Sequence, residues 1–214
     1  MKVVLVNGSP NKEGCTYTAL KEVASTLEEQ GVETEIFWIG KKAISGCNAC
    51  RKCRELKKCI FDDPVNEFLD KAETADAFVF GSPVYWAGAN GAMKAFLDRV
   101  YYANAYSGRN LLAFKPAASV TSARRAGTSV TLDELNHFIT HDQMLLVGST
   151  YWPMVHGYSP EDVMQDEEGL QIMRQLGRNI AWTLALKRAG EEAGVPLPEQ
   201  EKPIQTNFIK RQKK

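Results

Sequence analysis

The chain has 214 residues, with 26 Lys and Arg against 26 Asp and Glu and 44% hydrophobic residues. This length predicts a single globular domain with a core large enough to need no disulfide bonds. A formal net charge of zero provides no overall field toward nucleic acid or anionic lipid, so we expect neither as a partner.

Short apolar runs alternate with amphipathic segments along the chain. In chain order the pattern predicts strand 2–7, helix 16–30, strand 32–39, helix 64–73, strand 75–80, helix 89–102, strand 117–121, helix 132–140, strand 144–149 and helix 167–189. This alternation is typical of an α/β protein with an open parallel sheet and helices on both faces. Five strands fit the flavodoxin-like order 2-1-3-4-5.

The chain ends and the apolar runs bear on domain organisation and location. We expect one flavodoxin-like domain over 1–190, and a proline-containing C-terminal arm over 191–214 that contacts a second subunit. The N-terminal apolar run is too short for a secretory signal, and later runs are shorter than the roughly 20 residues of a membrane span. We therefore expect a cytoplasmic protein without a membrane partner.

The loop over 8–16 follows the first strand and leads into a helix. It is rich in small and hydroxyl residues, and unpaired N–H groups at a helix start favour an anion such as phosphate. It lacks the Gly-Lys-Ser/Thr ending of a Walker loop and the spacing of the Gly-x-Gly-x-x-Gly fingerprint. An ordinary capped turn is the alternative.

Two further loops follow the third and fourth strands, at the same sheet edge. The loop over 81–91 carries Tyr85 and Trp86 among glycines, which suits a flat ligand, although aromatic residues also cover cores and subunit interfaces. The loop over 121–129 carries paired arginines, which suit an anion or an electron-rich ring unless they are simply solvated. Because ligands bind beyond the carboxyl ends of parallel strands, we expect all three loops to meet.

Three motifs resemble those of the NAD(P)H-dependent FMN reductase family of flavodoxin-like proteins. They are Gly8-Ser9-Pro10 with Gly14-Cys15-Thr16, then Ser82-Pro83-Val84-Tyr85-Trp86, then Met93-Lys94-Ala95-Phe96-Leu97-Asp98-Arg99. The resemblance covers roughly residues 1 to 185. It implies an FMN site in which phosphate lies at the first loop and the isoalloxazine between the other two. The implied FMN-binding residues are Ser9, Asn11, Cys15, Thr16, Tyr17, Pro83, Val84, Tyr85, Trp86, Ser122, Arg124, Arg125 and Gly127.

Four cysteines follow the second predicted strand, at Cys47, Cys50, Cys53 and Cys59. Four thiolates are the ligand set of an iron–sulfur cube or of tetrahedral zinc, but zinc sites usually separate two Cys-x2-Cys pairs by a longer spacer. The segment also resembles that of the iron–sulfur flavoproteins, which implies a [4Fe-4S] cluster near the flavin. Five basic residues lie among the thiols, where they attract an acidic electron carrier or NADPH phosphates, or form a solvated rim: Arg51, Lys52, Arg54, Lys57 and Lys58.

The resemblance implies an FMN-dependent oxidoreductase that takes a hydride from NAD(P)H and passes electrons to a quinone, a flavin or another small acceptor. Because flavin performs the chemistry, no catalytic side chain is expected. One alternative is an iron–sulfur flavoprotein that relays single electrons from a ferredoxin-like donor. An alternative of another class is a non-catalytic module stabilised by zinc. The family implies a homodimer or homotetramer.

Overall fold

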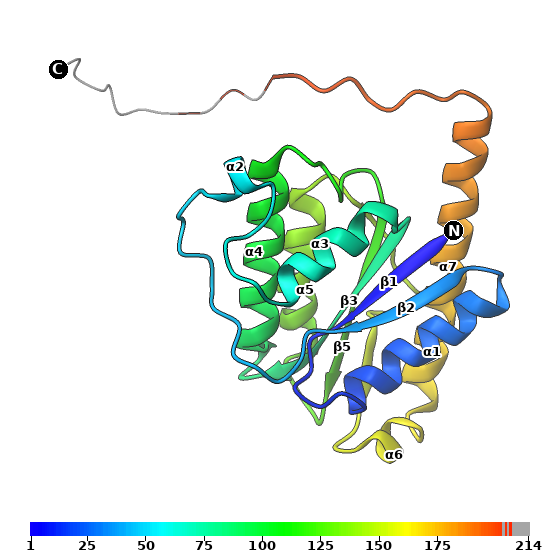
Figure 1. Ribbon diagram of the computed structural model, residues 1–214. Coiled ribbons are helices and arrows are strands. Elements are labelled where there is room, and N and C mark those ends of the chain that lie inside the picture. Colours follow the sequence, from blue (N-terminus) through cyan, green and yellow to red (C-terminus); the bar gives the residue numbers. More distant parts are fainter. Residues whose placement is uncertain (203, 205, 207–214) are drawn as a thin grey trace.

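Among the described residues, seven strands form one sheet whose main path runs β2-β1-β3-β5-β6 (Figure 1). The computed structural model describes residues 1–202, 204 and 206. The strands are β1 (Lys2–Asn7), β2 (Glu33–Trp38), β3 (Ala77–Tyr85), β4 (Gly88–Ala89), β5 (Pro116–Ala123), β6 (Leu145–Leu146) and β7 (Met154–His156). The helices are α1 (Cys15–Glu29), α2 (Cys53–Leu56), α3 (Pro64–Thr74), α4 (Gly91–Ser107), α5 (Thr128–His141), α6 (Pro160–Val163) and α7 (Glu167–Glu192).

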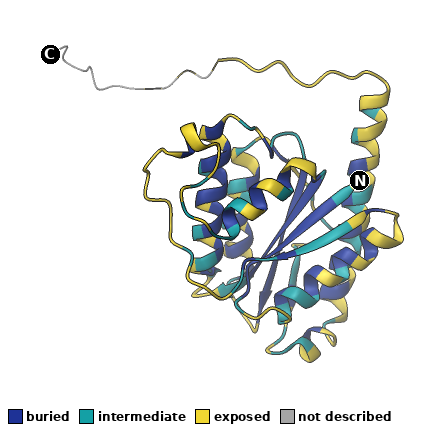
Figure 2. Ribbon diagram, viewed as in Figure 1, coloured by how far each residue is buried: buried dark blue, intermediate teal, exposed yellow. Residues whose placement is uncertain are grey.

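The central strands are buried on both faces, as their apolar sequences require. In β1, Val4 and Val6 point into the core shared with α3, α4 and α5, while Val3 and Leu5 point into the core shared with α1 and α7. Side chains of a strand alternate between faces, so a strand covered on both sides needs apolar residues at every position. Figure 2 shows this central layer in dark blue, between helices with exposed outer faces.

The expected flavodoxin-like α/β fold is confirmed, with helices on both faces and the strand order that was predicted. The predicted count of five strands is wrong, because the sheet contains seven. One extra strand is β4, which folds back antiparallel onto β3. The other arises because the final edge is broken into β6 and β7, both paired with β5.

The last predicted strand is interrupted in the structure. The predicted strand 144–149 pairs with β5 only through two residues, and the chain then leaves the sheet before β7 pairs near the other end of β5. The excursion carries Tyr151 and Trp152, whose side chains are exposed and pack edge to face. An apolar run alone does not reveal where a strand leaves its neighbour.

The C-terminal region begins with α7, which extends to Glu192. Beyond it the described residues form an extended segment that runs across the top of the view in Figure 1. Gln200 contacts the fold through a 3.0 Å hydrogen bond from the amide of Gln143. Part of the predicted arm over 191–214, including its basic end, lies outside the described residues. No described helix is both long enough and apolar enough to cross a membrane.

Candidate functional site

The loop over 8–16, here called the phosphate loop, is held by its own polar residues. The Ser9 amide donates to Asn7 Oδ1 at 3.0 Å, and the Asn11 amide donates to Ser9 Oγ at 3.1 Å. Helix α1 then starts after Gly14, which provides no side-chain cap, and its first turn has no acidic residue. Its first N–H groups therefore face the loop without a capping side chain, as a phosphate site requires. Among the predicted residues here, Ser9 is buried, Asn11 is exposed, and Cys15 and Tyr17 are half-buried.

The phosphate loop is joined to the loop over 81–91, here called the aromatic loop. The amide N–H of Gly8 donates to the carbonyl of Gly81 at 2.8 Å. The Asn90 side chain donates to the carbonyl of Gly8 at 2.6 Å, while its oxygen accepts from the amide of Met93 at 2.7 Å. Asn90 thus caps α4 and ties two loops together, and it is almost fully buried.

The loop over 121–129, here called the arginine loop, meets both others. The hydroxyls of Thr16 and Ser122 lie 2.7 Å apart in the interior. The side chain of Thr16, which was predicted to bind phosphate, therefore bonds to the arginine loop. Gly127 packs directly against the aromatic loop: its φ is +95°, and a Cβ there would lie 2.6 Å from the Cα of Ala87. The predicted convergence of the three loops is therefore present in the structure.

The tip of the aromatic loop is a tight β3–β4 hairpin. Trp86 and Ala87 both have positive φ, at 51° and 60°, which is uncommon for residues other than glycine. The Glu134 carboxylate holds the β4 strand of the hairpin by accepting from the Ala89 amide at 2.7 Å, and it also accepts from Lys94 at 3.1 Å. Burial opposes its ionisation, but these two donors hold the pKa of Glu134 below its ordinary value. The hairpin thus presents a fully exposed Trp86 on a fixed backbone.

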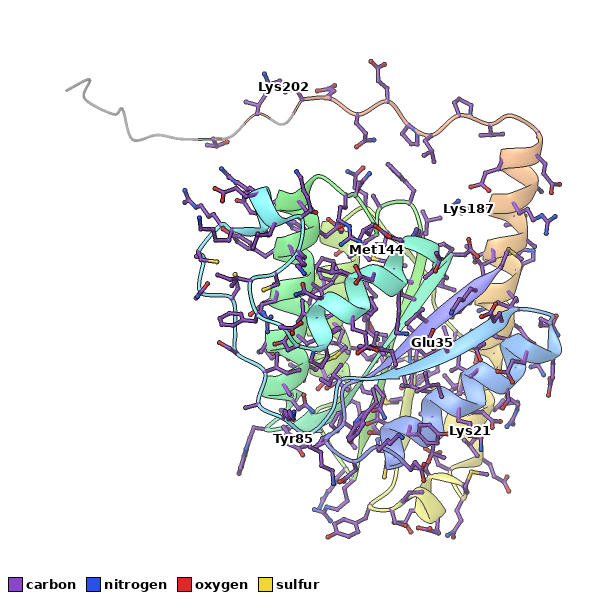
Figure 3. The ribbon with its side chains drawn as sticks, viewed as in Figure 1. Lys21, Glu35, Tyr85, Met144, Lys187 and Lys202 are labelled. Carbon is purple, nitrogen blue, oxygen red and sulfur yellow. The ribbon has the colours of Figure 1, made fainter. Side chains whose placement is uncertain are left out.

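The other predicted flavin residues lie around this hairpin. Tyr85 is half-exposed at the lower end of the molecule in the view of Figure 3. Pro83 and Val84 are partly buried beneath it, whereas Arg124 and Arg125 are exposed on the arginine loop. This end of the sheet therefore offers exposed aromatic surface, cations and unfilled helix N–H groups side by side, which suits a flat anionic cofactor.

The four clustered cysteines lie elsewhere, against α4. Cys47, Cys50, Cys53 and Cys59 all line one hollow, here called the cysteine hollow, together with Arg99, Phe61 and Tyr102. The enclosed part of the hollow is small, about 20 Å³, and the volume reaches about 310 Å³ only when the open space at its mouth is included. Cys53 begins α2 and is buried, Cys59 is partly buried, and the other two are exposed. All five cysteines of the chain are free thiols.

The proximity of the thiols has an electrostatic consequence. Burial, and then the charges of the three neighbouring cysteines, raise the pKa of Cys53. Four thiolates in one hollow repel one another unless cations lie among them. A cluster of iron ions supplies such charge, and thiolate is its usual ligand. The chemistry of the donor set therefore fits an iron–sulfur cluster.

Four residues that hold these sites are not among the predicted site residues. Asn90 and Glu134 position the aromatic loop, and Arg99 with Asp63 lies behind Cys59. The capping pattern before α4 signals Asn90. The partners of the others are 36 to 45 residues away in the sequence, so no local pattern signals them.

A model of the NADPH-dependent FMN reductase family matches residues 1–159. The chain belongs to the NADPH-dependent FMN reductase family. It is accordingly an oxidoreductase that uses FMN, and this membership argues against the non-catalytic zinc module.

Among similar proteins, an iron–sulfur flavoprotein of Methanocaldococcus jannaschii is 32% identical over 193 residues, which covers 87% of this chain and 98% of that protein. An iron–sulfur flavoprotein of Archaeoglobus fulgidus is 30% identical over 197 residues, covering 90% of this chain and 96% of the relative. The crystal structure of RosB with a bound riboflavin-phosphate intermediate superposes with a TM-score of 0.70 at 13% identity, covering 99% and 93% of the two chains. That last similarity supports the fold of this family member.

Gly127→Ala tests the contact between the aromatic and arginine loops. The added Cβ meets the backbone of Ala87 and displaces the two loops, so we expect the Kd for FMN to rise about tenfold, which corresponds to about 1.4 kcal/mol. Fluorescence titration of the apoprotein with FMN measures it.

The matched control is Gly31→Ala. Its φ of +74° imposes a similar backbone strain, but nothing lies within 4 Å of the added atom. We expect this control to bind FMN like the unmodified protein. Equal FMN affinity in all three proteins would contradict the placement of FMN between these loops.

Proposed function

We propose that this FMN-dependent oxidoreductase is an iron–sulfur flavoprotein in which Cys47, Cys50, Cys53 and Cys59 bind a [4Fe-4S] cluster. The observation that carries the proposal is that the four thiols line one hollow, although they are spread over 13 residues of loop and helix. Four thiolates match the ligand number of a cube. Free thiols are maintained in a reducing cytoplasm, where we place the protein.

The spacing of the cysteines along the chain favours a cluster over a single zinc ion. Zinc sites usually separate two Cys-x2-Cys pairs by a longer spacer, which is absent between Cys47 and Cys59. Four cysteines in a compact run are a usual ligand set of an iron–sulfur cube.

We propose that the predicted flavin residues hold FMN at the edge where the three loops meet. Ser9, Asn11 and the first amides of α1, from Cys15 to Tyr17, would hold the phosphate, while Thr16 anchors this turn to Ser122. The segment 83–86 and the arginine loop, including Gly127, would hold the ring. Bound FMN supplies hydride acceptance from NAD(P)H and electron transfer onward.

The protein's own residues then decide what reaches the ring. Arg124 and Arg125 place positive charge where electrons accumulate, and such charge stabilises a reduced, anionic flavin. The exposed Tyr85 and Trp86 offer an aromatic surface to a small acceptor such as a quinone or another flavin. None of these roles requires a side chain to act as nucleophile, acid or base.

We propose that an acidic, ferredoxin-like carrier exchanges electrons at the cysteine hollow. The segment 41–58, here called the basic loop, contains seven Lys and Arg residues and one acidic residue, Glu55, in a chain with no net charge. All eight side chains are exposed, and the loop runs along one side of the molecule (Figure 2). A concentration of one sign of charge around a redox site attracts a partner of opposite sign.

We also propose a homodimer or homotetramer. Trp152 and Tyr158 are exposed by 59% and 83%, in addition to Trp86, and Ile204 near the end of the described chain is also exposed. Aromatic side chains are enriched in subunit interfaces. Light scattering on a size-exclusion column should give two or four chains per particle, and a monomer at micromolar concentration would refute this proposal.

Serine variants of the four clustered cysteines test the cluster. Anaerobically reconstituted protein should contain about four irons per chain, and each of Cys47→Ser, Cys50→Ser, Cys53→Ser and Cys59→Ser should lower that number by at least half. The matched control is Cys15→Ser, because Cys15 lies on α1 outside the hollow. Iron and FMN are assayed on the same samples. FMN without iron in the unmodified protein would favour a plain FMN reductase.

Charge reversal tests the carrier. The double variant Lys42→Glu/Lys58→Glu should slow reduction by a reduced ferredoxin about tenfold at low salt, since electrostatic steering contributes factors of 10 or more to association rates. The difference should shrink as salt is added. Lys21→Glu changes one charge on α1, away from the basic loop, and should have little effect (Figure 3). An equal rate for all three proteins at low salt would argue against this docking surface.

A further inference from the structure

A buried arginine lies behind the cysteine hollow. Only 1% of the Arg99 side chain is exposed, although α4 has an outer face open to solvent. Its Nε and Nη2 atoms donate to Cys59 Sγ at 3.3 Å and 3.2 Å. Its Nη1 and Nη2 atoms donate to the two carboxylate oxygens of Asp63 at 2.5 Å and 2.9 Å. One guanidinium thus bridges a carboxylate and a sulfur.

The energetics of burial explain the carboxylate. An unpaired charge in the interior costs several kcal/mol, and Asp63 offsets this cost in a bidentate geometry. Burial opposes the charged state, but the hydrogen bonds to Asp63 and Cys59 raise the pKa of Arg99 above its ordinary value. Arg99 also lies over the ring of Phe61, 4.7 Å from its centre. These contacts with Asp63, Cys59 and Phe61 hold the guanidinium in one position.

The two bonds to sulfur require a different explanation. A neutral thiol is a weak hydrogen-bond acceptor, whereas a thiolate is a strong one. Two donors of a permanent cation aimed at one sulfur therefore fit an anionic Cys59. A thiolate bound to iron is such an acceptor.

Cys59 is also fixed through its backbone. Its amide donates to Asn66 Oδ1 at 2.8 Å, and the Asn66 side chain donates to the carbonyls of Cys59 at 3.0 Å and Phe61 at 2.8 Å. Asn66 belongs to α3, the helix that Asp63 caps. Cys47 and Cys50, by contrast, lie on an exposed loop. Arg99 therefore contacts a proposed ligand whose backbone is itself held by α3.

We propose that Arg99 and Asp63 form a charge pair that sets the reduction potential of the cluster through Cys59. This inference rests on the proposed function, in which Cys59 is a cluster ligand. Reduction adds one electron from an external donor and no proton. The net charge of the cluster with its thiolate ligands therefore becomes one unit more negative. Hydrogen bonds to the ligand sulfur and net charge nearby are established determinants of such potentials. Arg99 favours the reduced form, and Asp63 limits that effect.

The pair provides two substitutions of opposite expected sign. Arg99→Gln removes the cation and leaves Asp63, so the cluster should become harder to reduce. Asp63→Asn leaves the cation uncompensated, so the cluster should become easier to reduce, and asparagine keeps the helix cap. At a fixed potential we expect the ratio of reduced to oxidised cluster to change at least tenfold in each direction, which for one electron is about 59 mV.

The measurement is an anaerobic titration of full-length, iron-loaded protein with dithionite and redox mediators, followed by electron paramagnetic resonance. The double variant Asp63→Asn/Arg99→Gln should return close to the unmodified ratio. Arg109→Gln is the matched control, because Arg109 pairs with Asp70 and Glu73 and its nearest partners include no sulfur. It should leave the ratio unchanged.

Iron content is measured first on every protein. An unmodified protein without iron defeats the proposed function itself, before the charge pair is tested. The inference is overturned if the iron-loaded variants Arg99→Gln and Asp63→Asn have the same reduction potential as the unmodified protein, or if both potentials shift in the same direction. If Arg99→Gln fails to fold or to retain iron, Asp63→Asn and Arg99→Lys decide it, since the lysine keeps the charge but cannot make both bonds to sulfur and both to Asp63.

Discussion

Among the buried polar side chains of helix α4 and its N-cap, Asn90 and Arg99 shape the two candidate sites, because each needs partners in the interior. Asn90, at its start, finds partners in the phosphate loop and in the first turn of the helix. Arg99, near its middle, finds partners in Asp63 and Cys59. A buried polar group without a partner costs more than a hydrogen bond contributes, so each anchor demands a defined surrounding structure. The flavin edge and the cysteine hollow are thus built on one rigid element.

The two anchors are separated along α4. From position 90 to position 99 the rise is about 14 Å along the helix axis, at 1.5 Å per residue. The three loops at the end of the sheet are joined by short hydrogen bonds and by close backbone contact at Gly127. Such preorganisation suits electron transfer, in which the protein holds and tunes cofactors and does not react itself.

Much of the fold could be predicted from the sequence, because strong periodic patterns determine it. The strand at 2–7 and the long helix that begins at Glu167 appear as expected, and the parallel topology brings the three loops to one edge. The hairpin tip could not be predicted, because Trp86 and Ala87 adopt positive φ without being glycine. Nor could the broken edge strand, since pairing with β5 stops where the apolar character of the run continues.

Only part of the cysteine hollow could be predicted from the sequence. Four thiols in 13 residues indicate a shared metal centre, and their spacing indicates which kinds of metal centre fit. The contact between Arg99 and Cys59 joins residues 40 apart and follows only from the packing of α4 against the loop before α3. On a helix with mixed polarity, an arginine is normally expected to be solvated. Its burial is therefore a result of tertiary structure.

Native mass spectrometry of protein prepared without oxygen tests the central claim most directly, because it weighs the intact chain with everything bound to it. The account predicts one FMN and one [4Fe-4S] cluster for each chain, in the same particle. A chain that carries FMN and zinc, or FMN and no metal, would contradict it.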